Sequence, residues 1–192
     1  MNKYINLKNT ELFKNKSIEI APLTVLTGTN GSGKTTVLKS IENQFPNTKY
    51  YKWTGLSVFK EYFKGEEGDI LLFEQPEVGL HPKLQLALAD VLLDYAQAGR
   101  TVVVETHSDH IINRLTRRFV EKQEVRKLIK IYFLEHKADL EQNVSEIMNI
   151  PINDVDGCIC ANKDFFYQFA DETIKIVDAG YKNLQKKHRD KL

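Results

Sequence analysis

The sequence is short of several features that mark special protein classes. It holds two cysteines, Cys158 and Cys160, in one C-x-C spacing without a second pair, so neither a disulfide framework nor a cysteine-rich zinc site is indicated. The formal net charge of +1 gives no case from bulk charge for nucleic acid or a membrane surface. No apolar run approaches the length that spans a bilayer, and residues 1–13 lack the apolar core of a signal peptide. We therefore expect a cytoplasmic protein without membrane contact.

Four short apolar runs alternate with helical patterns along the 192 residues. The runs are β-branched or leucine-rich with little alternation, which predicts strands of a mostly parallel sheet flanked by helices. Ser108 is typical of an N-cap, Pro82 of a first turn and Gly99 of a C-cap. The alternation predicts an α/β domain with right-handed crossovers. The predicted strands lie at 23–26, 70–73, 101–104 and 128–134, and the predicted helices at 34–44, 82–99 and 108–123.

The ends of the chain carry weaker patterns. YINLKN (4–9) and SIEIAP (17–22) favour a small antiparallel flap beside the sheet. After residue 140 the pattern weakens: NIPINDVDG (149–157) indicates a strand and turn, and the residues from Phe165 onward indicate a terminal helix that grows basic. The length is typical of one domain, so we expect residues 1–192 to form a single domain.

A glycine-rich loop joins the first apolar run to the first helix. GTNGSGKT (28–35) matches G-x-x-x-x-G-K-[ST] in full, in the strand–loop–helix context of this motif, the P-loop. Its glycines let successive N–H groups converge on phosphate oxygens at the positive end of a helix dipole. Lys34 is expected to reach the β- and γ-phosphates, and the Thr35 hydroxyl to bind Mg²⁺. The sequence predicts a nucleoside triphosphate site made of Gly28, Thr29, Asn30, Gly31, Ser32, Gly33, Lys34, Thr35 and Thr36.

Two further segments resemble those of ABC-type ATPases. ILLFEQPEVGLHP (70–82) is similar to their Walker B strand and following loop. TVVVETHSDHIINRL (101–115) resembles their histidine switch, with T-H-S at a strand end. TGLS (54–57) resembles a degenerate form of the ABC signature motif. The combination is most similar to stand-alone ATPases of the overcoming-lysogenisation-defect, RecF and SMC group, over about residues 4–180. Because only 38 residues separate Thr35 from Glu74, the resemblance implies a reduced ABC ATPase head whose helical lobe is nearly absent.

The resemblance implies a role for each matching position. Glu74 is implied to hold Mg²⁺ through water, Gln75 stands at the catalytic-glutamate position, and His107 is implied to contact the γ-phosphate. Glu77 lies in the loop that crosses to a partner subunit in that group. Ser57 is implied to cap the γ-phosphate of ATP held by the other protomer. The expected assembly is therefore a homodimer that encloses ATP.

Glutamine at position 75 changes the expected chemistry. A carboxamide cannot accept a proton at neutral pH, so a general-base contribution of about 10²–10⁴ in rate is lost. A glutamine still orients the attacking water, as one does in small GTPases, so we predict slow hydrolysis. Glu105, which ends the strand expected beside Walker B, and Glu77 are the two candidates to compensate. Glu105 has an equal alternative as a partner that orients His107 or Mg²⁺.

Three functions remain open. The first is an ABC-type ATPase that dimerises on ATP and controls a separate effector protein, a nuclease or a toxin, in bacterial phage defence. That context comes from the resemblance alone. The second is a DNA-maintenance ATPase of the SMC or RecF kind, for which basic residues within 114–127 and 182–189 are candidate DNA contacts. The third is a non-hydrolysing interaction module in which ATP is structural.

Overall fold

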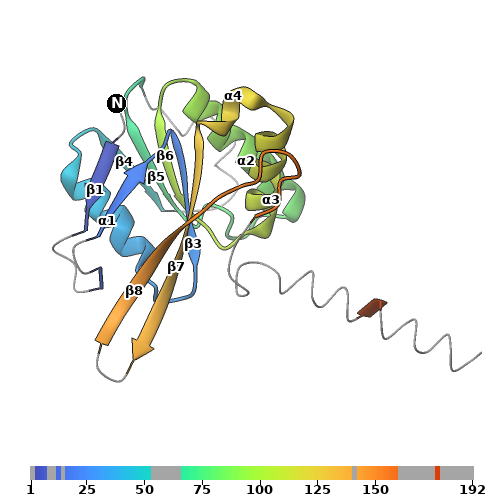
Figure 1. The fold of residues 1–192 in the computed structure, drawn as a ribbon. Coiled ribbons are helices and arrows are strands. Elements are labelled where there is room, and N and C mark those ends of the chain that lie inside the picture. The colour runs from blue at the N-terminus through green and yellow to red at the C-terminus, as the bar shows by residue number, and fades with distance from the viewer. Residues whose placement is uncertain are drawn as a thin grey trace, which may run out of the picture. The chain divides into compact units, whose positions relative to one another are not determined.

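The computed structural model describes residues 3–7, 12–13, 16–52, 66–139, 142–159 and 176–177 (Figure 1). The chain separates into two units, Met1–Cys160 and Ala161–Leu192. The first unit carries the sheet and the site described below. In the second unit the described residues are Ile176 and Val177, which are helical. The rest of the predicted terminal helix lies outside the described residues, and the single domain over 1–192 stays a prediction.

A six-stranded sheet with the strand order β4-β5-β6-β3-β7-β8 forms the centre of the first unit (Figure 1). All neighbouring pairs are parallel except the β7–β8 hairpin, which is antiparallel. The four predicted strands are confirmed as β3, β5, β6 and β7, and the mostly parallel α/β architecture with them. The bounds are β3 Leu23–Gly28, β4 Thr48–Lys52, β5 Ile70–Glu74, β6 Thr101–Glu105, β7 Ile129–Asp139 and β8 Gln142–Ile150.

Strand β4 was missed by the sequence analysis. Its sequence, TKYYK, contains no apolar run, and no residue of the strand is fully buried. This pattern suits its place at the edge of the sheet, where one side of the strand has no neighbour. Most of strand β8 was also missed, because the strand and turn predicted at 149–157 overlap it only at Asn149 and Ile150. The predicted turn is present and is closed by a bridge between Ile152 and Ile159.

Four helices are described in the first unit: α1 Lys34–Gln44, α2 Pro82–Gln97, α3 Asp109–Glu121 and α4 Gln123–Arg126. The three predicted helices are confirmed, and so are Pro82 and Ser108 at the starts of α2 and α3. The C-cap of α2 is Ala98 rather than the predicted Gly99, which lies one residue further on. Pro82 opens α2, and Gly99, with φ +82°, follows its end. The Ser108 hydroxyl accepts a hydrogen bond from the Ile111 N–H at 3.2 Å, which satisfies one of the free donors at the start of α3. Across the described residues, no helix combines the length and the apolar character needed to cross a membrane.

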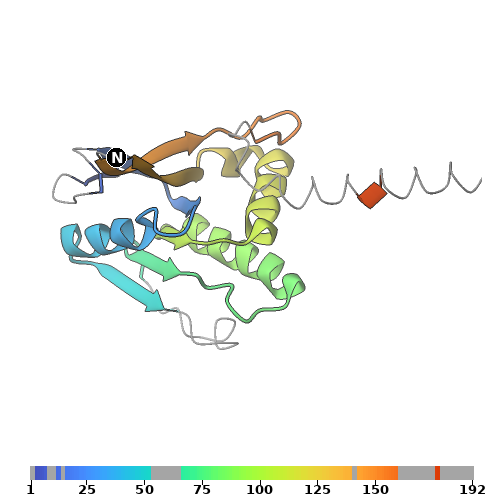
Figure 2. The same ribbon diagram turned by 90° about the horizontal axis from the view of Figure 1, so that it is seen from below.

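The predicted N-terminal flap is confirmed as an antiparallel pair, β1 Lys3–Asn6 and β2 Ser17–Ile20. Helix α1 lies between this pair and the central sheet (Figures 1 and 2). Its side chains Val37, Leu38 and Ile41 are fully buried against both layers. Each such side chain stabilises the fold by about 1.5–3 kcal/mol. The buried layers therefore fix the helix whose first turn follows the P-loop.

The carboxyl ends of β3, β5 and β6 meet at one edge of the sheet because these strands are parallel. The register places Glu74 of β5 opposite Glu105 of β6, and Glu105 opposite Leu26 of β3. The loop at 28–33, the turn at 75–81 and the segment at 106–108 leave the sheet at this edge. The sheet thus assembles the predicted site from three separate stretches of sequence, as α/β folds commonly do.

Candidate nucleotide-binding site

The P-loop runs from the end of β3 to the start of α1, as predicted. Gly28, Gly31 and Gly33 all have positive φ, at +134°, +74° and +89°, which is the backbone that a tight phosphate-binding turn requires. The tip at residues 29–31 is exposed. Thr36 follows within the first turn of α1. The loop therefore offers backbone N–H groups and a helix N-terminus to solvent, the arrangement that binds phosphate.

Lys34 is folded back onto this loop. Its ammonium donates to the Thr29 carbonyl at 2.7 Å, to the Gly28 carbonyl at 3.2 Å and to the Ser32 hydroxyl at 3.4 Å. Burial lowers the pKa of Lys34, and the negative charge of Glu105 opposes that shift. The ammonium is thus held at the loop by neutral acceptors, with a carboxylate nearby.

Glu105 reaches the P-loop threonine. The Thr35 hydroxyl donates to Oε2 of Glu105 at 2.9 Å, and the Glu105 side chain is only 2% exposed. Burial raises the pKa of Glu105, while hydrogen bonding from Thr35 and Gln75 and the charge of Lys34 lower it. The end of β6 therefore contributes a buried carboxylate directly to the predicted metal-binding position.

Glu74 has different partners, which the sequence analysis did not foresee. The Tyr50 hydroxyl donates to Oε2 of Glu74 at 2.6 Å, and the Lys52 ammonium lies 3.4 Å from the same oxygen. Both residues belong to β4, the strand that was missed. Burial, followed by the hydrogen bond to Glu74, strongly raises the pKa of Tyr50, so its hydroxyl remains a donor. The mixture of tyrosine and lysine in TKYYK was the available signal, but it does not reveal a partner.

Gln75 occupies a strained position immediately after β5. Its φ is +46°, and it is the one non-glycine with positive φ among the described residues. A left-handed conformation costs a side-chain-bearing residue roughly 1–2 kcal/mol. The Gln75 N–H donates to the Glu105 carbonyl at 2.9 Å, and its own carbonyl accepts from the Val78 N–H at 3.2 Å. These bonds hold the turn in place, and such strain is typical of functional positions.

Glu77 connects this turn to the switch segment, which is the stretch at 106–108 that contains His107. Its Oε1 accepts from the His107 backbone N–H at 2.8 Å, whereas its buried Oε2 has no hydrogen-bond partner among the described residues. Burial raises the pKa of Glu77, and the hydrogen bond from His107 partly offsets that shift. A second link runs from the Ser108 hydroxyl to Oε1 of Gln85 at 2.5 Å. The turn after β5 and the segment after β6 are therefore tied together twice.

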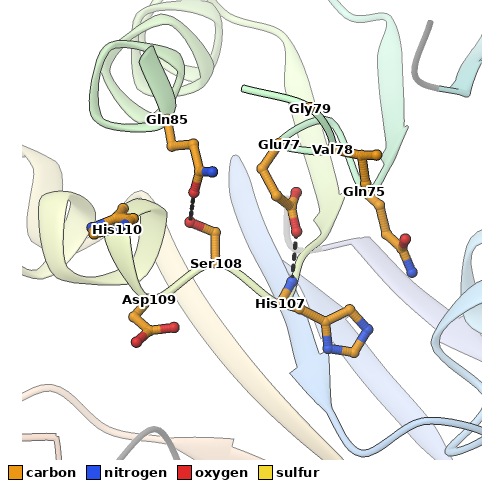
Figure 3. Close-up of a pocket in the computed structure, with 9 residues that line it drawn as sticks. All are labelled: Gln75, Glu77, Val78, Gly79, Gln85, His107, Ser108, Asp109 and His110. Carbon is orange, nitrogen blue, oxygen red and sulfur yellow. Dashed lines mark hydrogen bonds between the residues drawn. The ribbon is translucent and has the colours of Figure 1, made fainter. Parts of the chain in front are cut away.

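A cleft of about 410 Å³ lies between these two segments (Figure 3). The Gln75 carboxamide and the His107 imidazole reach toward the same side of it, while His110 points away from them (Figure 3). Val78 and Gly79 form its exposed outer rim. The arrangement places a carboxamide and an imidazole at the sheet edge that carries the P-loop.

All predicted site residues that are described lie at this edge of the sheet, namely residues 28–36, Glu74, Gln75, Glu77, Glu105 and His107. Ser57 lies outside the described residues. The sequence analysis missed Tyr50 and Lys52, which contact the predicted residue Glu74. It also missed Gln85, which accepts a hydrogen bond from Ser108, the N-cap of α3. The chemical roles of the site residues stay predictions at this point.

The donor set fits a magnesium ion. The Thr35 hydroxyl and the carboxylates of Glu105 and Glu74 supply hard oxygen atoms, the kind that Mg²⁺ prefers. Within the described ranges, no group of three or more His, Cys, Asp or Glu side chains is placed to hold a metal. Mg²⁺ is usually bound through one or two carboxylates together with substrate phosphates, so this set is compatible with it.

The basic residues of α3 and α4 have acidic partners. Asp90 on α2 accepts hydrogen bonds from Arg114 and Arg118 of α3. Glu121 pairs with Arg117 and Arg118, and Asp154 pairs with Arg126. An arginine in such a pair gives up a carboxylate before it binds a phosphate. DNA binding through this face stays a prediction that these contacts do not favour. The paired arginines are Arg114, Arg117, Arg118 and Arg126.

Known proteins match parts of this chain. Residues 62–113 match the family described as "AAA domain, putative AbiEii toxin, Type IV TA system". That span contains β5, α2, β6 and the switch segment, but not the P-loop. A segment of 81 residues is 25% identical to a protein of Methanosarcina acetivorans named "Putative ABC transporter ATP-binding protein". It covers 42% of this chain and 26% of that relative, so the chain spans about a quarter of the relative's length.

Two solved structures are similar at low identity. One is a nucleotide-free ATP-binding cassette from an ABC transporter, with a TM-score of 0.46 and 12% identity. The other is an ATP-binding cassette of an ABC transporter in its ADP conformation, with a TM-score of 0.44 and 13% identity. Each match covers 69% of this chain and 87% of the solved one. The family and sequence matches, taken with the P-loop at the edge of the sheet, support an ABC-type ATPase-like nucleotide-binding domain.

Proposed function

We propose that this protein is an ATP-binding, slowly hydrolysing ABC-type ATPase that dimerises on ATP and gates a separate effector protein. The observation that carries the proposal is the meeting of three elements at one sheet edge. They are the P-loop with Lys34, the Thr35–Glu105 hydrogen bond, and a strained Gln75 at the catalytic-glutamate position. This combination binds a triphosphate tightly while it lacks a proton acceptor at the usual place.

Different residues of the chain have separate roles in nucleotide binding and hydrolysis. Backbone N–H groups of the P-loop and the Lys34 ammonium bind the phosphates, and Thr35 with a strand-end carboxylate holds the magnesium ion. A bound Mg²⁺ neutralises charge on the β- and γ-phosphates. His107 contacts the γ-phosphate. Because phosphoryl transfer depends mostly on positioning and charge stabilisation, hydrolysis continues without a general base at position 75.

Gln75 sets the rate in this scheme. Its carboxamide orients water but accepts no proton, and Glu77 and Glu105 are the carboxylates available nearby. Restoring a carboxylate at position 75 supplies the missing general base, whose typical contribution is about 10²–10⁴ in rate. Slow hydrolysis keeps the ATP-bound form closed for longer, which suits a protein that gates another.

The test replaces Gln75 by Glu and measures ATP hydrolysis under single-turnover conditions. We expect a rate increase of at least about 10²-fold, the lower end of the range for general-base catalysis. Gln97→Glu is the matched control, because Gln97 is an exposed glutamine at the end of α2. This substitution adds the same negative charge at a position away from the site. An unchanged rate in Gln75→Glu would show that the missing carboxylate does not limit the reaction.

We further propose that the effector acts in bacterial anti-phage defence. The proposal draws on the resemblance to the overcoming-lysogenisation-defect group and on the matched family's description, which names a toxin and a type IV toxin–antitoxin system. A co-purification with the product of a neighbouring reading frame, performed with and without ATP, identifies the effector. Survival of cells carrying both proteins, or this chain alone, during phage infection then tests the defence role. Protection that is independent of Lys34 would contradict it.

A further inference from the structure

Two carboxylates at the edge of the sheet are candidates for the magnesium-holding role, and the sheet separates them. Glu74 and Glu105 lie opposite each other on neighbouring parallel strands. Strand β6 lies between β5 and β3, so Glu105 stands one strand closer to the P-loop than Glu74 does. Adjacent strands are about 4.8 Å apart, which is a large displacement on the scale of a metal site. The expectation from the sequence was that Glu74 holds Mg²⁺.

Glu105 is held on the P-loop side. Its Oε2 accepts the Thr35 hydroxyl hydrogen at 2.9 Å, and Thr35 is the P-loop residue whose hydroxyl binds Mg²⁺ in such loops. A hydroxyl and a carboxylate are thus already joined at the predicted metal position.

Glu74 is held on the opposite side, toward β4. The Tyr50 hydroxyl donates to its Oε2 at 2.6 Å, and the Lys52 ammonium lies 3.4 Å from that oxygen. No hydrogen bond joins Glu74 to Thr35 among the described contacts. One oxygen of Glu74 is therefore engaged by two donors from the edge strand, which lies on the far side of β5 from the P-loop.

We propose that Glu105, rather than Glu74, is the carboxylate that works with Thr35 to hold the hydrated divalent cation of a nucleoside triphosphate. Tyr50 is a positioning residue that holds Glu74 toward β4. This assignment rests on the proposed nucleotide binding, and it moves the main metal-holding carboxylate from the end of β5 to the end of β6. In this assignment Glu105 serves as the metal-holding carboxylate rather than as the general base.

The experiment measures how much Mg²⁺ strengthens nucleotide binding. A fluorescent ATP analogue is titrated into the full chain with excess EDTA and again with saturating Mg²⁺, and the ratio of the two dissociation constants is the metal-dependent gain. Loss of a partner that orients a metal ligand typically weakens metal affinity by about 10–100-fold. We expect Glu105→Gln to reduce the gain by that factor, and Glu74→Gln and Tyr50→Phe to reduce it by less than about threefold.

Controls separate the possible failures. Tyr51→Phe, on the same strand, removes a hydroxyl from a ring stacked on Phe73 and leaves the gain unchanged. If Glu105→Gln does not fold, Glu105→Asp keeps the charge, shortens the reach and is expected to lower the gain in the same direction. A larger loss in Glu74→Gln than in the Glu105 variant would overturn the assignment. So would a Glu105→Gln variant that loses hydrolysis with an unchanged gain, because that result identifies a base.

Failure of the proposed function gives a different result from failure of this inference. If the unsubstituted chain binds no nucleotide in EDTA or in Mg²⁺, nucleotide binding itself is refuted. If the unsubstituted chain binds nucleotide with a metal-dependent gain, and Glu74→Gln rather than Glu105→Gln lowers that gain, only the assignment to Glu105 is wrong.

Discussion

Alanine at Gly28 is expected to destabilise the protein much more than alanine at Gly31, although both glycines belong to the same loop and have positive φ. Gly28 lies opposite Leu134 of β7, and a Cβ at Gly28 would stand 1.9 Å from the Leu134 carbonyl oxygen. That oxygen also accepts the Thr29 N–H at 3.0 Å. At Gly31 nothing lies within 4 Å of the added Cβ.

The magnitudes follow from these contacts. Both variants carry the left-handed backbone cost of roughly 1–2 kcal/mol, partly offset by a stiffer unfolded chain. Gly28→Ala adds a backbone clash of roughly 1–3 kcal/mol and weakens a hydrogen bond worth about 0.5–1.5 kcal/mol. We therefore expect Gly28→Ala to be less stable than Gly31→Ala by about 2–4 kcal/mol. At about 2–4 °C per kcal/mol, the difference in Tm is roughly 5–15 °C.

Thermal and urea unfolding of both variants, followed by circular dichroism without nucleotide, measures this difference. The absence of nucleotide matters because ligand binding would stabilise the variants unequally. Equal destabilisation of the two variants would refute the reasoning, since it would mean that β7 does not press against the end of β3 beneath the P-loop.

Two further predictions concern the turn after β5. Val78 lies at the tip of this turn and is 51% exposed. Val78→Asp is therefore expected to abolish ATP-dependent dimerisation, measured by light scattering, while ATP still binds. The control is Val155→Asp, at a valine that is 81% exposed elsewhere, and it is expected to leave dimerisation intact. Equal dimerisation of both variants would place the interface elsewhere. Burial raises the pKa of Glu77, so its ionisation costs stability above that pKa. The free energy of unfolding of the unsubstituted protein relative to Glu77→Gln should therefore rise as the pH falls from neutrality toward the ordinary glutamate value of about 4.3. A flat difference in urea unfolding would show that Glu77 is not buried as an acid.

Local patterns were sufficient for the parts of the fold that depend on burial on both faces. The apolar runs at 70–73 and 101–104 lie between neighbouring strands, so their composition alone identifies them. The P-loop was predictable because its turns need positive φ angles, which glycine adopts readily and other residues rarely adopt. Ser108 was predictable because an N-cap interacts with the backbone a few residues away.

The remaining features depend on contacts between distant segments. Strand β4 is polar because it lies at the edge of the sheet, and an edge strand needs no apolar run. The pairing of Tyr50 with Glu74 joins residues 24 positions apart, and the pairing of Thr35 with Glu105 joins residues 70 apart. Sequence patterns identified both carboxylates as site residues. They did not reveal which carboxylate faces the P-loop, because that depends on the strand order.

Isothermal titration calorimetry of Mg²⁺ and ATP into the purified full chain tests the central claim most directly, with Lys34→Ala measured in parallel. Lys34 is the cation that the loop holds for a phosphate, so we predict a saturable heat for the unsubstituted protein and a loss of at least about tenfold in affinity for the variant. No heat with either protein, or equal affinities for the two, would contradict the account.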